Sequence, residues 1–232
     1  MPDDRDRLRA EYERRVTDAS VRERERSGDP AHVFLLQSRE RDVLALLRRA
    51  GFDLSSTRVL DVGSGSGEWL RSLLGYGSEP ELLCGIDLLP DRVARARHLN
   101  PTIDFRCGSA EALPYEDGRF DLVAQFTVFS SILDETLQNR VATEMWRVLR
   151  PGGAVLWYDF WVNPLNPATR PVGRRGISRL FPFCNAIWKR TTLAPPLARF
   201  AVRRLWALGT MLELLPFLRT HYLALLIKGP AC

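Results

Sequence analysis

Cysteine is scarce in this 232-residue sequence, which has four cysteines and no Cys-x-x-Cys pair. The sequence therefore gives no indication of a zinc ribbon or a disulfide framework, and a reducing compartment is the expectation. Long apolar runs are missing as well, because no stretch of about 18 uncharged apolar residues occurs. The N-terminal segment has no apolar signal core. We expect a soluble, cytoplasmic protein without a metal site.

Acidic residues are nearly absent from the last third of the chain. Residues 161–232 contain eleven basic side chains and one acidic side chain, although the net charge of the whole chain is only +5. Such a basic block is compatible with contact to nucleic acid, to an anionic lipid surface or to a phosphorylated substrate, and equally with a solvated surface. Charge alone leaves these alternatives open.

Apolar residues make up 45% of the chain, which is enough for the core of one α/β domain. Short apolar runs alternate with helical stretches from residue 58 onward, a pattern typical of βαβ units and a parallel sheet. The predicted strands are 58–62, 82–87, 103–106, 120–126, 154–160, 186–193 and 220–227. The predicted helices are 5–26, 32–50, 67–74, 91–98, 137–149 and 197–215. Residues 161–182, rich in Pro, Gly, Asn and Arg, are expected to form a long loop.

A glycine-rich turn follows the first predicted strand, in the run Arg58-Val-Leu-Asp-Val-Gly-Ser-Gly-Ser-Gly67. Gly63, Gly65 and Gly67 lack Cβ atoms, so the backbone can turn sharply and a ligand can approach the free amides of a helix N-terminus. The spacing is GxGxG, whereas a dinucleotide-binding enzyme more typically has GxGxxG to seat a pyrophosphate. Asp61, just before the turn, suits the ammonium group of S-adenosylmethionine better than a phosphate. A tight turn without a ligand is the alternative.

A second acid, Asp87, ends the next predicted strand about 20 residues after the glycine turn. A carboxylate at this place can accept hydrogen bonds from both ribose hydroxyls of a nucleoside. Capping of the helix that begins near Pro90 is the other interpretation. The spacing favours ribose binding.

Four segments lie in one order within roughly residues 58–160. They are VLDVGSGSGEWL, GIDLLPDRVARAR, CGSAEALPYEDGRFDLVAQFTVFS and EMWRVLRPGGAVLWYDF. Together they resemble the class I S-adenosylmethionine-dependent methyltransferases. The resemblance implies a doubly wound α/β fold of Rossmann-like type, with a mostly parallel seven-stranded sheet and an antiparallel last strand. It also implies S-adenosylmethionine as the cofactor and transfer of its methyl group to an acceptor, with S-adenosylhomocysteine as the product.

The resemblance also assigns residues to the cofactor. By this resemblance the cofactor-binding residues are Asp61, Gly63, Ser64, Gly65, Gly67, Asp87, Leu88, Ser109, Ala110, Gln125 and Phe126. The glycine turn would border the methionine part, Asp87 would hold the ribose and Leu88 would pack on the adenine. The family often has an acidic residue where this chain has Ser109, whose hydroxyl can still form a hydrogen bond, and the amide of Ala110 could serve an adenine nitrogen. Gln125 would contact the amino acid end of the cofactor, unless it is only a solvated strand end.

A general base is optional for methyl transfer, because in-line positioning supplies much of the acceleration of a displacement at a sulfonium. For a hydroxyl or phenol acceptor, removal of its proton would help, and the candidates for this role are Asp159, Tyr158 and His32, followed by Tyr12 and His221. Asp159 and Tyr158 end the fifth predicted strand, at the sheet edge where open α/β folds bind ligands. His32 begins the helix before the domain and either covers the cofactor or lies at the surface.

The domain organisation expected from this pattern has two parts. Residues 1–50 would form an N-terminal helical cap, and residues 51–232 the S-adenosylmethionine-binding domain. Within that domain, the basic and apolar segment 161–218 would form a lid. Arginines alternate with aromatic residues and leucines between Arg170 and Arg204, so this segment either packs on the sheet or makes a peripheral membrane contact that admits a lipid-linked acceptor.

The expected acceptor is a small molecule. No Asn-Pro-Pro-Tyr-like motif follows the fourth strand and no RNA-binding module is evident, so no nucleic-acid partner is expected, with a nucleic-acid methyltransferase as the alternative. The SAEALP and RVLRPGG segments most resemble the quinone, sterol and natural-product branch of the family, which implies a secondary-metabolite or lipid-like biosynthetic intermediate. A noncatalytic S-adenosylmethionine-binding protein and a nicotinamide-dependent oxidoreductase are the rivals from other classes.

Overall fold

The computed structural model describes most of the chain beyond residue 27. The described residues are 7–8, 10–11, 14, 28–164, 166, 168–182 and 184–229. The helix predicted over 5–26 therefore lies largely outside the described residues, as does Tyr12; the five residues described within it are helical. None of the helices in the described part of the chain is long and apolar enough to cross a membrane.

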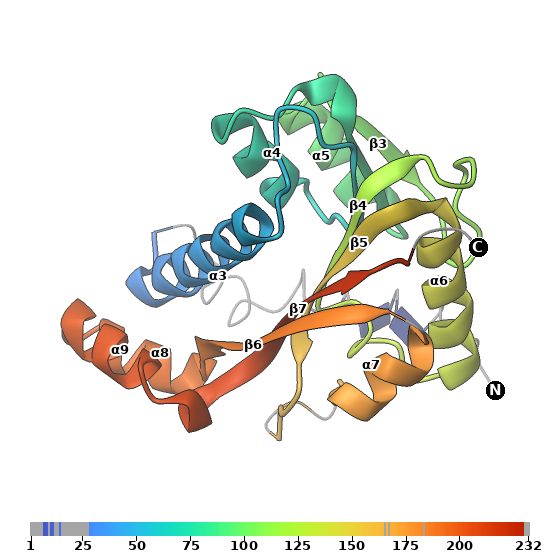
Figure 1. The fold of residues 1–232 in the computed structure, drawn as a ribbon. Helices are drawn as coiled ribbons and strands as arrows, with labels where there is room; N and C mark the ends of the chain where they lie inside the picture. The colour runs from blue at the N-terminus through green and yellow to red at the C-terminus, as the bar shows by residue number, and fades with distance from the viewer. Residues whose placement is uncertain are drawn as a thin grey trace.

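Seven strands form one sheet at the centre of the fold (Figure 1). They are β1 (Val59–Val62), β2 (Leu83–Asp87), β3 (Asp104–Cys107), β4 (Phe120–Phe126), β5 (Leu149–Phe160), β6 (Asn185–Leu193) and β7 (Arg219–Ile227). Their order is β3-β2-β1-β4-β5-β7-β6, in which β1 to β5 are parallel and β7 runs antiparallel to both neighbours. The predicted doubly wound fold is confirmed. Because the strand order switches between β1 and β4, the carboxyl ends of these strands border a crevice suited to a ligand.

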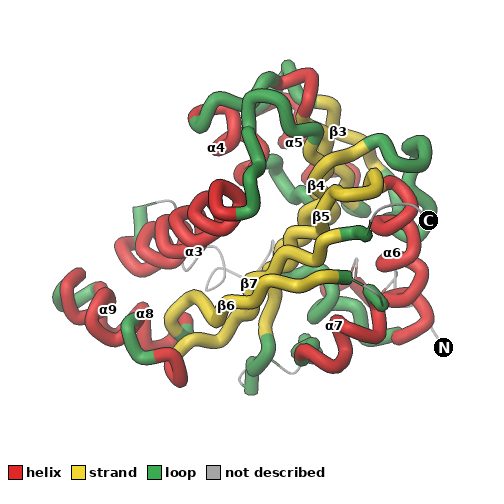
Figure 2. The backbone as a smooth tube through the Cα atoms, viewed as in Figure 1, coloured by secondary structure: helices red, strands yellow, loops and turns green. Residues whose placement is uncertain are grey.

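Helices cover both faces of the sheet, as Figure 2 shows. They are α3 (Pro30–Arg49), α4 (Glu68–Gly75), α5 (Pro90–Leu99), α6 (Glu135–Val148), α7 (Arg174–Leu180), α8 (Pro195–Val202) and α9 (Trp206–Glu213), with 3-10 turns η1 (Pro80–Leu82) and η2 (Pro216–Leu218). Side chains of α3, α4 and α5 form one core with the sheet, in which Leu47, Leu70 and Val93 are buried. Helices α6 and α7 cover the opposite face, where Met145 and Ile177 are buried.

The prediction of a loop over 161–182 is wrong for the second half of this segment, which contains α7. The Gly, Pro and Arg content of this segment concealed three apolar residues at helical spacing, Ile177, Leu180 and Phe181. Ile177 and Phe181 are fully buried, and the ring centroid of Phe181 lies 6.2 Å from that of Trp157 in β5. Packing on the sheet therefore stabilises a short helix that composition did not indicate.

The single helix predicted over 197–215 is instead two helices, α8 and α9. The apolar run is nearly continuous, so its pattern showed no break. Helix α9 folds back on α8, and Gly209 permits the approach, because a Cβ atom there would lie 2.4 Å from Cγ2 of Val202. The ring of Trp206 in α9 also meets Phe34 of α3 edge-on, with 5.3 Å between centroids. Helices α8 and α9 thus form a hairpin beside α3, at the lower left of Figure 1.

Candidate active site

The glycine turn connects β1 to α4 and is fastened to β2. The amide of Gly63 donates to the carbonyl oxygen of Ile86 at 2.8 Å. Gly63 has a φ of 74°, and a Cβ atom there would lie 2.5 Å from Cγ2 of Val128. Gly65 has a φ of 55°, but a Cβ atom there would meet only the tip of Arg92, at 3.9 Å. The turn is therefore closely packed at its start and open to a cavity at its middle.

Asp87 joins the end of β2 to the glycine turn. Its Oδ2 accepts a hydrogen bond from the amide of Gly65 at 2.8 Å, and its Oδ1 accepts one from the amide of Leu89 at 3.0 Å. Leu89 precedes α5, whose first turn receives no side-chain cap. Asp87 therefore does not cap that helix. Because a carboxylate has about four acceptor sites, Asp87 can still accept hydrogen bonds from the hydroxyl groups of a ligand in the cavity that it lines.

Asp61 lines the same cavity from β1 and is only 3% exposed. Its Oδ1 has no hydrogen-bond partner within the described part of the chain. Burial raises the pKa of this carboxyl well above its usual range, while the guanidinium of Arg39 lowers it and the carboxylate of Asp87 raises it further. A buried carboxylate with an unsatisfied oxygen is costly unless a ligand compensates it. The site is therefore suited to a cationic, hydrogen-bond-donating group.

Arg39 enters this cavity from α3 and was not identified from the sequence. Its guanidinium carbon lies 4.8 Å from the ring centroid of Phe126 and 5.8 Å from that of Tyr158. Its Nε is buried and has no hydrogen-bond partner among the residues described. Arg39 thus supplies a positive charge beside Asp61, so the cavity offers both signs of charge to a zwitterionic ligand.

The cavity bounded by these residues has a volume of about 830 Å³. Nine of the eleven residues assigned to the cofactor from the sequence line it: Asp61, Gly63, Ser64, Gly65, Asp87, Leu88, Ser109, Ala110 and Phe126. The other two do not. Gly67 is the first residue before α4, where a Cβ atom would lie 2.4 Å from the ring of Phe105, and Gln125 lies behind the cavity wall.

Gln125 is fully buried and braces the turn after β4. Its side-chain nitrogen donates to the carbonyl oxygen of Tyr158 at 3.4 Å, and its side-chain oxygen accepts from the amide of Val128 at 3.0 Å. Between them lies Thr127, whose φ of 57° is unusual for a residue other than glycine. Gln125 therefore shapes the cavity wall, and the structure does not bring its side chain to the cavity itself.

A second cavity, of about 770 Å³, adjoins the first, and both are lined by Thr127 and Ser131. Its apolar walls are Leu35, Phe160, Val162, Pro164, Ala194, Pro195, Pro196 and Leu197. Its polar lining consists of Glu11, Arg14, His32, Ser130, Asn163, Asn166, Thr169, Arg199 and Thr220, with the shared Thr127 and Ser131. Although more of these residues are polar than apolar, most of the surface that they present to the cavity is apolar, which is typical of sites for small organic molecules.

Among the catalytic candidates described, only His32 lines the second cavity. Asp159 is fully buried beneath its wall, where Oδ2 accepts from the amide of Ser130 at 3.0 Å and Oδ1 from the amide of Phe160 at 2.8 Å. Burial raises the pKa of Asp159 to about 6. Because Ser130 and Phe160 both line the cavity, Asp159 positions two wall residues and does not itself face a ligand.

Tyr158 and His221 are parts of the core. The hydroxyl of Tyr158 forms a hydrogen bond of 2.9 Å with Oγ1 of Thr192, and its ring stacks on His221 with 4.6 Å between centroids. Burial raises the pKa of Tyr158 to about 12 and, together with Arg39, lowers the pKa of His221 to about 3. Neither side chain lines either cavity, so their arrangement supports a structural role.

Comparison with known proteins agrees with this geometry. A family model for a methyltransferase domain matches residues 59–153. A glycine/sarcosine/dimethylglycine N-methyltransferase from Actinopolyspora halophila is 36% identical over 143 residues, which cover 57% of this chain and 25% of that protein. A ubiquinone biosynthesis O-methyltransferase from Xanthomonas oryzae is 34% identical over 138 residues, covering 57% of this chain and 55% of that protein. Residues 59–153 therefore match a methyltransferase domain, and over this region the chain is similar to S-adenosylmethionine-dependent methyltransferases.

The fold of this chain is also shared with a solved structure. A SAM-dependent methyltransferase from Archaeoglobus fulgidus superposes with a TM-score of 0.58 at 16% identity, over 84% of this chain and 98% of that one. At that identity the likeness shows the fold alone. The chain spans between a quarter and about half of the length of the two curated relatives.

S-Adenosylmethionine is the cofactor that the family implies, and the first cavity contains the kinds of group that this molecule needs. The unsatisfied oxygen of Asp61 suits an ammonium group, and Asp87 suits ribose hydroxyls. Leu88 and Ala110 provide apolar surface for a flat ring. The residues present therefore fit the cofactor.

Proposed function

We propose that this methyltransferase transfers the methyl group of S-adenosylmethionine to a small, partly apolar acceptor bound in the second cavity. The observation that carries the proposal is the junction of the two cavities, which share Thr127 and Ser131 as wall residues. An acceptor in the second cavity can approach the first cavity directly at this junction. Methyl transfer needs the acceptor atom in line with the methyl group, and this arrangement supports such an approach.

The residues of the first cavity have distinct roles in this proposal. Asp61 binds the ammonium of the cofactor, Arg39 faces its carboxylate, and Asp87 accepts hydrogen bonds from the ribose hydroxyls. Leu88 and Ala110 pack on the adenine. When bound, S-adenosylmethionine supplies an electrophilic methyl group on a sulfonium. The chain contributes position and fixed charges around the cofactor, and both lower the barrier to the displacement.

Residues 1–50 act as a cap and residues 161–218 as a lid in this proposal. From the cap, Arg39 lines the first cavity and His32 the second. From the lid, 162–164 and 195–197 contribute apolar walls to the second cavity. Neither segment lines the second cavity by itself, which supports a site completed by both of them.

The acceptor class follows from the wall of the second cavity, because the relatives differ in what they act on. One is named for glycine, sarcosine and dimethylglycine, and the other for O-methylation in ubiquinone biosynthesis. The largely apolar lining of the second cavity favours the second kind of molecule, a lipid-like or secondary-metabolite intermediate with a nucleophilic polar group. We include in the proposal a peripheral contact of the C-terminal third with a lipid surface.

Transfer of label from methyl-labelled S-adenosylmethionine into a fractionated extract of the natural host tests this function. We expect label in the small-molecule or lipid fraction, lost with Asp61→Ala and kept with Asp104→Ala, a matched acid that is exposed on β3 and lines neither cavity. Label only in nucleic acid would overturn the acceptor class. Tight cofactor binding without transfer would support a noncatalytic binding protein instead.

A further inference from the structure

Exposed apolar side chains are concentrated in α8, α9, η2 and the short segments between them. Among the nine large apolar side chains that are exposed in the described part of the chain, seven lie here: Phe200, Leu205, Trp206, Met211, Leu214, Leu215 and Phe217. We call this set the 200–217 surface. Leu214 and Phe217 are each 70% exposed. Single exposed apolar residues are ordinary, but seven of them within 18 consecutive residues are a concentration typical of an interaction site.

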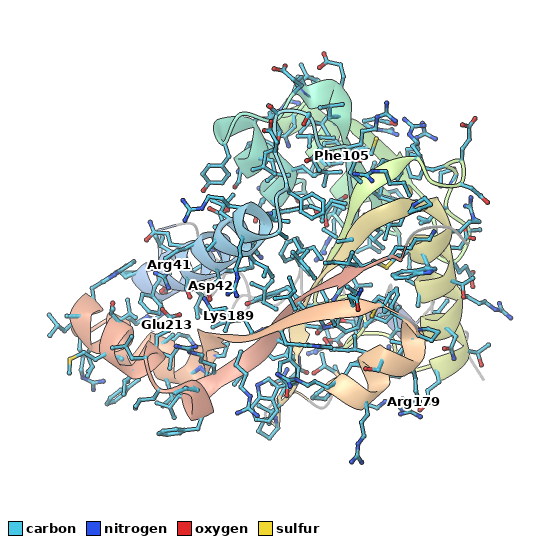
Figure 3. All side chains as sticks on the ribbon, viewed as in Figure 1. Arg41, Asp42, Phe105, Arg179, Lys189 and Glu213 are labelled. Atoms are coloured by element: carbon cyan, nitrogen blue, oxygen red, sulfur yellow. The ribbon has the colours of Figure 1, made fainter. Side chains whose placement is uncertain are left out.

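Helix α9 exposes apolar side chains although it buries an acid; Leu208 and Leu212 are half-buried on its inner side. Its buried residues are Gly209 and Glu213, whereas Met211 is 66% exposed. Glu213 is held inside by Arg41, whose Nη2 lies 2.9 Å from Oε2, and by the hydroxyl of Ser38; Figure 3 labels Glu213 and Arg41 where α9 meets α3. These polar contacts fix the orientation of α9, which leaves Met211 exposed. An amphipathic helix in contact with water alone would present polar residues at such a position.

Basic side chains accompany the 200–217 surface. The chain has four arginines and one acid between residues 195 and 219, and that acid is the buried Glu213. The guanidinium carbon of Arg204 lies 3.8 Å from the ring centroid of Phe200, which joins charge and apolar area in one place. Aromatic and aliphatic side chains with neighbouring arginines suit the interface of a bilayer that contains anionic lipid.

The 200–217 surface begins where the wall of the second cavity ends. Residues 195–197 and Arg199, in the first turns of α8, line that cavity, and Phe200 follows directly. A molecule embedded in a lipid surface at Phe200 would therefore be next to residues that line the cavity. Such a path keeps an apolar acceptor out of water during transfer.

We propose that the 200–217 surface docks on an anionic lipid bilayer and admits a bilayer-embedded acceptor to the second cavity. This inference rests on the proposed function, because it uses the second cavity as the acceptor site. A second copy of the chain is a poorer occupant. In a symmetric contact the same patch of both copies meets, which would bring the arginines of both copies together.

Cosedimentation of the full chain with vesicles tests the docking. Vesicles of phosphatidylcholine with phosphatidylglycerol should bind the protein more strongly than pure phosphatidylcholine vesicles, and added salt should weaken the binding. We expect Leu214→Asp to lower the vesicle partition coefficient roughly tenfold or more. Leu99→Asp is the matched control, because Leu99 is an exposed leucine at the end of α5 and outside the 200–217 surface. It should leave the partition coefficient unchanged.

Two further measurements separate the alternatives. Absence of native binding to anionic vesicles, or equal losses in the two variants, would overturn the docking. If sedimentation equilibrium shows a dimer and Leu214→Asp dissociates it, the 200–217 surface is an interface between two copies of the chain and the lipid docking is refuted. Calorimetric titration with S-adenosylmethionine should give the same affinity for Leu214→Asp as for the native chain; a protein that binds vesicles but not the cofactor would refute the proposed function and leave the docking intact.

Discussion

Asp87 accepts a hydrogen bond from the backbone amide of Gly65, at 2.8 Å. The acid at the end of β2 therefore fixes the open middle of the glycine turn, and it keeps acceptor capacity for a ligand in the cavity that both residues line. One carboxylate thus connects the shape of the turn to the groups that a nucleoside would meet. Loss of that carboxylate should affect both.

Asp87→Ala should lower the affinity for S-adenosylmethionine by roughly 10- to 100-fold. The substitution removes charge-assisted hydrogen bonds, each worth about 1.5–3 kcal/mol, and also releases the amide of Gly65. Isothermal titration calorimetry measures the affinity, and far-ultraviolet circular dichroism checks that the fold persists. The exposed acid Asp104 on β3 provides the control, since Asp104→Ala should bind the cofactor as the native chain does. An Asp87→Ala protein with native affinity would refute the ribose assignment.

Asp61→Asn should stabilise the cofactor-free protein while it weakens cofactor binding roughly tenfold or more. Burial raises the pKa of Asp61 above its usual value, so the folded chain holds a proton that the unfolded chain has already released. The native free energy of unfolding therefore falls as pH rises above about 3.9, and the neutral amide avoids this loss.

Urea unfolding of the native chain and of Asp61→Asn, at pH 5 and pH 8 without cofactor, measures this effect. The advantage of the variant should be larger at pH 8, because more of the native carboxyl is then forced to ionise. A variant less stable than the native chain at pH 8 would show that Asp61 is satisfied within the fold.

The strands and the glycine turn were predictable because their signals are local. Each predicted strand is a short apolar run, and the turn needs glycines at the positions where φ is positive, Gly63, Gly65 and Gly67. Asp61 lies near the carboxyl end of β1 and Asp87 lies at the carboxyl end of β2. Because these strands are parallel, the two acids meet at the same edge of the sheet. Local pattern and sheet topology together were enough to gather most of the cofactor cavity.

The parts that were missed depend on tertiary packing. Arg39 lies between Leu35 and Val43 on one face of α3, so a charged residue within an apolar row was a usable signal of function. Nothing local shows that this face of α3 meets the end of β1. The sequence does not show to which face of the sheet the side chain of Gln125 points. In the structure, hydrogen bonds to the neighbouring backbone hold it away from the cavity. The orientation of α9 depends on the contact of Glu213 with Arg41 in α3, two residues that are far apart in the sequence.

Asp159 should make stability fall with rising pH in the weakly acidic range. Its pKa is raised to about 6 by burial, against an ordinary value of about 3.9. Between these values the unfolded chain has lost the proton that the folded chain keeps, so the free energy of unfolding decreases as pH rises, by up to about 2–3 kcal/mol in all.

Urea unfolding at several pH values between 4 and 7 isolates this contribution when the native chain is compared with Asp159→Asn. Other titrating groups affect both proteins equally, so the native value minus the variant value should fall across this range and level off above it. A difference that stays constant with pH would mean that Asp159 titrates normally in the fold.

His32→Asn distinguishes a proton acceptor from a wall residue in the second cavity. If His32 removes the proton of a hydroxyl acceptor, kcat should fall roughly a hundredfold or more while KM for the acceptor and the affinity for the cofactor change little. If the imidazole only contacts the acceptor, KM should rise and kcat should persist. His98, exposed near the end of α5 and outside both cavities, offers the matched control His98→Asn. Equal kinetics for the two variants would exclude both roles and leave in-line positioning at the Thr127 and Ser131 junction as the chain's main contribution to the transfer step.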